Sequence, residues 1–113
     1  MEKTIVFRAG KVLLDTKNLL SMMPNVISVA PVLEMCARYG LQSIDPQMDL
    51  LMVKMAQSGA SPTQLDMEIL ATIVREISQQ IKHEFLIQTR YSQIPEITQV
   101  GMVGFDLAVK VKE

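Results

Sequence analysis

The longest regular pattern of apolar and polar positions predicts an amphipathic helix from Pro62 to Arg90. Apolar residues recur every four positions along this segment, a spacing that places side chains on one face of a helix. They are Leu65, Ile69, Ile73, Ile77, Ile81 and Phe85. Ser61, Pro62 and Gln64 predict the start of this helix, with Ser61 as the N-cap, because these residue types are favoured at the N-cap, N1 and N3 positions.

Two shorter helices are predicted before it. One runs from Val29 to Tyr39 after Ser28 as the N-cap, and Gly40 follows as a left-handed residue beyond its end. Leu41 then folds back on Cys36, which belongs to the core. The other begins at Asp45 and Pro46 and continues to about Gln57. Its apolar residues cover most of its circumference, so we expect it to be buried on most sides.

Two segments predict strands. Thr4 to Arg8 is rich in β-branched and aromatic residues, and Phe105 to Lys112 alternates apolar with polar residues. We expect these two strands to pair, because an isolated strand is barely stable. Lys11 to Leu14 could form a second strand after the turn at Ala9 and Gly10. Alternatively, Asp15 or Thr16 caps a short helix that Pro24 stops.

Together these elements predict an α+β fold in which residues 1–113 form a single domain dominated by helices. A chain of 113 residues can bury a core of its own. We expect a long central amphipathic helix and a small sheet formed by the N- and C-terminal strands.

Composition and charge narrow the class of function. The chain carries 11 basic and 12 acidic residues, which argues against nucleic-acid binding, since that binding depends on neutralising phosphates. Cys36 is the only cysteine, so no disulfide forms within the chain, and a lone thiol suits the cytoplasm. The chain also has no signal-peptide pattern and no apolar run long enough to span a membrane, so we expect no membrane partner.

Residues 51–68 have the outline of a helix-turn-helix, with Gly59 in the turn. The exposed early residues of the second helix would include Asp66 and Glu68, and no lysine or arginine lies between Ala56 and Ile73 to balance them. Met55 stands where that motif usually has a small residue. We therefore favour a plain helical hairpin and keep a nucleic-acid-binding regulator as the alternative.

The chemistry-bearing residues do not form a recognisable site. His83 is the only histidine, and no metal-binding spacing of histidines or cysteines is present, so we expect no metal, no cofactor and a solvated His83. Cys36 lies on the expected buried face of its helix, where a thiol is inert. We therefore predict no catalytic residues and a protein that is not an enzyme.

The length of the long helix predicts association. An unbroken helix from Pro62 to Arg90 is about 43 Å long, whereas a compact chain of this size is roughly 35 Å across. The helix should overhang the domain, and its apolar residues should bind a partner. We expect the partner-binding residues to be Ile77, Ile81, Phe85 and Leu86. The sequence thus predicts a homodimer that also binds another protein and acts in assembly, as an adaptor or as a chaperone-like structural component.

Overall fold

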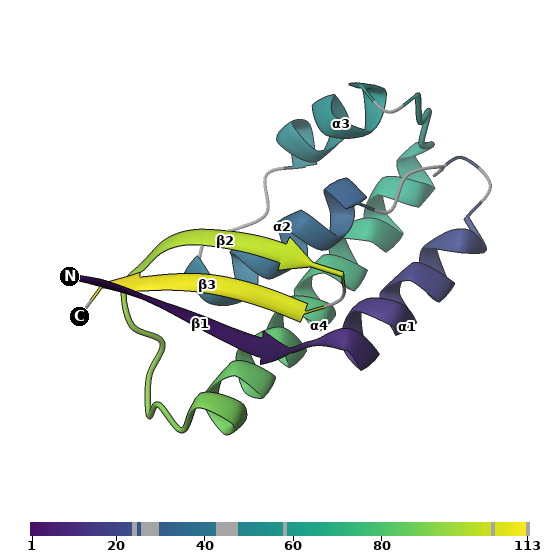
Figure 1. The fold of residues 1–113 in the computed structure, drawn as a ribbon. Helices are drawn as coiled ribbons and strands as arrows, with labels where there is room; N and C mark the ends of the chain where they lie inside the picture. The colour runs from purple at the N-terminus through teal and green to yellow at the C-terminus, as the bar shows by residue number, and fades with distance from the viewer. Residues whose placement is uncertain (24, 26–29, 43–47, 58, 105, 113) are drawn as a thin grey trace.

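The computed structural model describes the chain except residues 24, 26–29, 43–47, 58, 105 and 113 and the side chains of residues 48–50. Its elements confirm the predicted α+β class, with a helical layer on one side of a small sheet (Figure 1). In chain order they are β1 (Glu2–Arg8), α1 (Gly10–Ser21), α2 (Ala30–Gln42), α3 (Met48–Gln57), α4 (Gln64–Thr89), β2 (Ile97–Val103) and β3 (Asp106–Lys112).

The sheet has three antiparallel strands in the order β1-β3-β2. The predicted pairing of the terminal strands is confirmed, with Phe7 opposite Leu107. β2, which was not predicted from the sequence, pairs with the other side of β3. Gly104 lies in the turn between these two strands with a φ of +63°, a left-handed conformation that favours glycine. β3, the last strand in chain order, is therefore the central strand of the sheet.

α2 and α4 lie behind the sheet, while α1 lies beside α4 and α3 beyond the sheet next to α2 (Figure 1). α4 packs under β1 and α2 under β2, while α2 and α4 pack along each other. The predicted alternative strand at 11–14 is wrong, because these residues lie within α1. Two expected helix starts, at Ser28 and at Asp45, fall outside the described residues. α3 is less buried than predicted, since Met52 and Val53 are exposed while Leu51 and Met55 are buried.

The expected overhang of α4 is wrong. The molecule is 42 Å long and 23 Å by 21 Å in cross-section, and the 26 residues of α4 extend about 39 Å. The helix therefore forms the long axis of an elongated fold and does not project from a sphere. This removes the geometric reason for placing an interface on its distal half.

Most of the residues predicted to bind a partner lie in the core. Ile77, Ile81 and Phe85 are buried in the core of the single chain, and Leu86 is half-buried. The Phe85 ring packs edge-on against Phe7, with centroids 5.3 Å apart, and stacks on Tyr91 at 6.0 Å. β1 and the residues after α4 thus cover Phe85 within the single chain. The expectation of a homodimer itself stays a prediction.

The closest approach between helices occurs where α2 crosses α4. A Cβ atom placed on Gly40 would lie 2.5 Å from the backbone oxygen of Ser78 and 3.4 Å from the Cβ of Ile81. The Ser78 hydroxyl donates to the Cys36 carbonyl oxygen across the same contact, at 3.1 Å. The predicted role of Gly40 is therefore wrong: α2 continues through it to Gln42, and Leu41 is buried within the last turn. Glycine at position 40 instead allows α2 and α4 to pack closely.

The start of α4 is two residues later than predicted. Thr63 is the N-cap: its hydroxyl accepts from the Asp66 N–H at 3.2 Å, and the Asp66 carboxylate accepts from the Thr63 N–H at 3.0 Å. The Asn25 amide also donates to that carboxylate. The backbone hydrogen bond from Thr63, followed by that of Asn25, lowers the pKa of Asp66. Ser61 is exposed and lies outside the helix.

We predict that Gly40→Ala destabilises the protein by about 2 kcal/mol, because the overlap with α4 outweighs the better helix propensity of alanine. Gly101→Ala is the matched control, since its nearest neighbour would be an ordinary 3.9 Å away, and it should change stability by less than about 0.5 kcal/mol. Urea denaturation followed by circular dichroism measures both changes. Equal stability of the two variants would contradict the close crossing.

We predict that Thr63→Ala costs about 1 kcal/mol of stability, because the N-terminus of α4 loses its capping hydroxyl. Ser61→Ala should leave the denaturation midpoint unchanged, since the Ser61 side chain lies outside the capping box. The same urea titration applied to both variants tests the helix start. A larger loss of stability in Ser61→Ala than in Thr63→Ala would show that Ser61 is the N-cap of α4.

Candidate interaction surface

The sheet has one covered face and one exposed face. Phe7, Leu107 and Val109 point toward the helices and are buried. Alternate residues point the other way, because successive side chains of a strand lie on opposite faces. The outer face consists of Glu2, Thr4, Val6 and Arg8 from β1, Asp106, Ala108, Lys110 and Lys112 from β3, and Gln99, Gly101 and Val103 from β2. No described element packs against this outer face (Figure 1).

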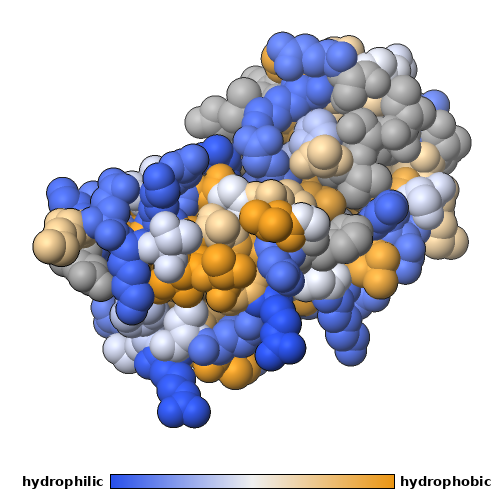
Figure 2. Space-filling view, in the orientation of Figure 1, coloured by the Kyte–Doolittle hydropathy of each residue, from blue (hydrophilic) through white to orange (hydrophobic). Residues whose placement is uncertain are grey.

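The middle of the outer face is apolar. Val6, Ala108 and Gly101 form one row across the three strands. Val6 is 62% exposed and Val103, next to this row, is 68% exposed. Figure 2, in which the sheet faces the viewer, shows apolar surface over the middle of the sheet and hydrophilic surface around it. An apolar centre within a charged rim is typical of protein-binding surfaces.

The charges on the outer face are arranged by strand. β1 has Glu2 at its beginning and Arg8 at its end, while β3 has Asp106 at its beginning and Lys110 and Lys112 toward its end. The antiparallel register places Glu2 opposite Lys112 and Arg8 opposite Asp106. Each of these strands therefore carries opposite charges at its two ends, and each charged pair across the strands is complementary.

The predicted helix-turn-helix segment forms a hairpin of α3 and α4. A groove of about 430 Å³ lies between α3 and the first turns of α4. It is lined by Met52, Pro62, Thr63, Gln64, Met67, Glu68 and Ala71. Asp66 belongs to the cap of α4, whereas Glu68 lines the groove. An apolar groove with a carboxylate is a poor surface for a phosphate backbone and fits a plain helical hairpin.

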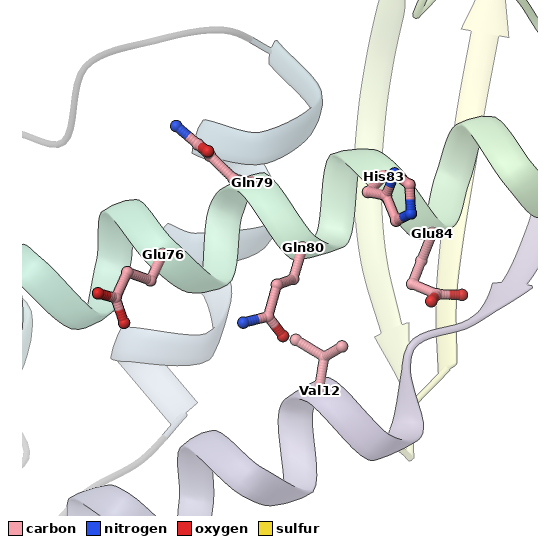
Figure 3. A pocket seen from close by; sticks show the side chains of 6 residues that line it. All are labelled: Val12, Glu76, Gln79, Gln80, His83 and Glu84. Atoms are coloured by element: carbon pink, nitrogen blue, oxygen red, sulfur yellow. The ribbon is translucent and has the colours of Figure 1, made fainter.

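A polar cleft lies between α1 and α4 (Figure 3). It has a volume of about 650 Å³ and is lined by Val12, Glu76, Gln79, Gln80, His83 and Glu84. Glu84 accepts a hydrogen bond from the Gln88 amide, and that amide in turn bonds both the N–H and the carbonyl of Arg8. Glu84 thus helps to hold the end of β1. Within the described residues no group of three histidine, cysteine or acidic side chains could hold a metal ion.

The two residues considered for chemistry lie far from a common site. His83 is exposed, as predicted, on the polar side of α4, and Cys36 is fully buried on α2, also as predicted. Burial raises the pKa of the Cys36 thiol to about 12. A buried thiol with a raised pKa is a packing residue, because the reactive form is the thiolate.

The sequence analysis missed the outer-face residues. The alternation of Ile5 and Phe7 with Val6 in β1 already places Val6 on the opposite side from the core. That signal was present, but its importance depends on β2 and on the position of the helices. Only then does Val6 lie at the middle of an uncovered sheet.

We predict that Cys36 reacts slowly with a thiol reagent in the native protein and rapidly after unfolding, because burial excludes the reagent and suppresses the thiolate. Ser92→Cys in a Cys36→Ala background supplies an exposed control thiol after α4. The absorbance of the released chromophore measures both rates. Native labelling of Cys36 at the rate of the control would contradict its burial.

In the described part of the chain, no helix combines the length and apolar character needed to cross a bilayer. Comparisons of the chain with protein-family models, curated proteins and solved structures give no match. Among the surfaces described above, the outer face of the sheet joins exposed apolar side chains to charges of both signs.

Proposed function

We propose that this protein is a small non-enzymatic assembly, adaptor or chaperone-like component of the cytoplasm that acts through protein–protein contact as a homo-oligomer. The outer face of the sheet is its contact surface. The observation that carries the proposal is the exposure of Val6 on β1 and Val103 at the end of β2, on the outer face of a sheet whose other face forms the core. Exposed apolar surface of this kind is stabilised when a protein partner removes it from water.

The other hollows support this proposal less well. The α1–α4 cleft is lined mainly by carboxylates, amides and His83, and Glu84 there already supports β1 through Gln88. The α3–α4 groove is apolar, but it has only one charged lining residue, Glu68, to orient a partner. The outer sheet face offers both the apolar area that drives association and the charges that orient it.

The alternative, a nucleic-acid-binding regulator of the helix-turn-helix kind, is supported by the α3–α4 hairpin and its short connection. Two features weigh against it. Lysine and arginine are absent between Ala56 and Ile73, and Glu68 would meet the phosphates with a like charge. Binding to duplex DNA that falls steeply with added salt would favour this alternative.

A photo-crosslinking amino acid at position 6 or 103 tests the contact surface in the cells that make the protein. We expect discrete protein adducts at both positions, identified by mass spectrometry as this chain or as one defined partner. The same group at position 82, an exposed lysine on α4, is the control. Adducts at positions 6 and 103 no more abundant than at position 82 would overturn the proposed surface.

A further inference from the structure

We propose that the occupant of the outer sheet face is a second copy of this chain, stacked face to face so that the two β3 strands run antiparallel. The two-fold axis then lies across the strands, along the row formed by Val6, Ala108 and Gly101. This inference rests on the proposed function, because it names the partner of the same surface. It also assigns a role to Asp106 and Lys110 of β3.

The charge pattern selects this arrangement. Two identical sheets can stack about a two-fold axis that runs either along or across their strands. An axis along β3 places each β3 residue over its own copy, so that Asp106 faces Asp106 and Lys110 faces Lys110. An axis across the strands reverses β3 over its copy, so that Lys110 faces the partner's Asp106. Opposite charges attract in the second case, and like charges repel in the first.

β1 adds less to this choice. Its acidic and basic ends are reversed relative to those of β3, with Glu2 beside Lys112 and Arg8 beside Asp106. On an axis through Val6, Arg8 lies over Thr4 of the second copy, two positions short of Glu2. The rotation that pairs Lys110 with Asp106 therefore places no like charges of β1 over each other, and the choice rests on β3.

The shape of the face allows this stacking. Ala108 and Gly101 have little or no side chain, so the centres of the two sheets can approach to about 10 Å, the usual spacing of packed sheets. Val6 and Val103 then supply the side chains that fill the space between them. The product has four layers, with the two helical layers outside and the two sheets within.

The size of the face predicts a weak dimer. Three strands of seven residues cover an area of only about 14 Å by 23 Å at standard spacings. This is well below the roughly 800 Å² per partner of a standard interface. We therefore expect a concentration-dependent dimer with a dissociation constant between about 1 µM and about 1 mM.

Pairing through a sheet edge is the competing way to join two copies. The β1 edge is occupied near its end, because the Gln88 amide bonds the N–H and carbonyl of Arg8. The β2 edge carries no charged residue, so β2 could pair with its own copy. Lys110 lies on β3, away from that edge, and such a dimer would be insensitive to its charge. The two arrangements therefore respond differently to a charge reversal.

Sedimentation velocity over about 10 µM to about 1 mM protein tests the stacking. Lys110→Glu places a carboxylate opposite the partner's Asp106 and should raise the dissociation constant at least about tenfold. Lys3→Glu makes the same charge change on the same sheet, but Lys3 alternates with the outer-face residues, so dimerisation should not change. The double variant Lys110→Glu with Asp106→Lys restores opposite charges and should return the dissociation constant to within about threefold.

Thermal unfolding at low concentration establishes that each variant is folded. A monomeric wild-type chain at the highest concentration would overturn the stacking, as would equal effects of Lys110→Glu and Lys3→Glu or a failure of the double variant to recover. Failure of the stacked dimer would not by itself refute the proposed function, because crosslinks from positions 6 and 103 to a different protein would still support that function. Absence of such crosslinks would remove the proposed function instead.

Discussion

The close crossing of α2 and α4 is the constraint on which the rest of this structure depends. At Gly40 the two backbones approach so closely that a single added carbon would lie 2.5 Å from the Ser78 carbonyl oxygen. The buried Ser78 hydroxyl is accommodated there because it donates to the Cys36 carbonyl. This contact sets the separation of the helices that support β1 and β2, and so sets the base on which the sheet lies.

The helices pack against one face of the sheet and leave the other free. Phe7 and Phe85 join the layers in an edge-on contact, and Tyr91 stacks on the far side of Phe85. The part of the α4 stripe formed by Ile77, Ile81 and Phe85 is thereby buried within the chain, whereas Leu65 and Ile69 near the start of the helix remain exposed. The sheet contributes further exposed apolar side chains, the valines of its outer face.

The position of β3 gives that surface its electrical character. β3 is the central strand and runs antiparallel to β1. The acidic end of each of these strands therefore lies beside the basic end of the other. The net charge of the chain is only −1, so long-range attraction or repulsion between copies is small. Orientation of a partner therefore depends on local charges around an apolar centre.

The sequence by itself determined the α+β class, the terminal strands, their pairing and the existence of a long amphipathic helix, because periodicity and strand propensity act over neighbouring residues. It also placed Cys36 in the core. It did not determine why Gly40 is a glycine, since a left-handed helix end and a close helix crossing require the same residue type. Nor could it show whether the stripe of Ile77, Ile81 and Phe85 is buried within the chain, because the stripe looks alike whether a second molecule or the chain's own elements cover it. Only the tertiary structure decided both the packing role of Gly40 and the burial of this stripe, because burial depends on which segments distant in sequence come together.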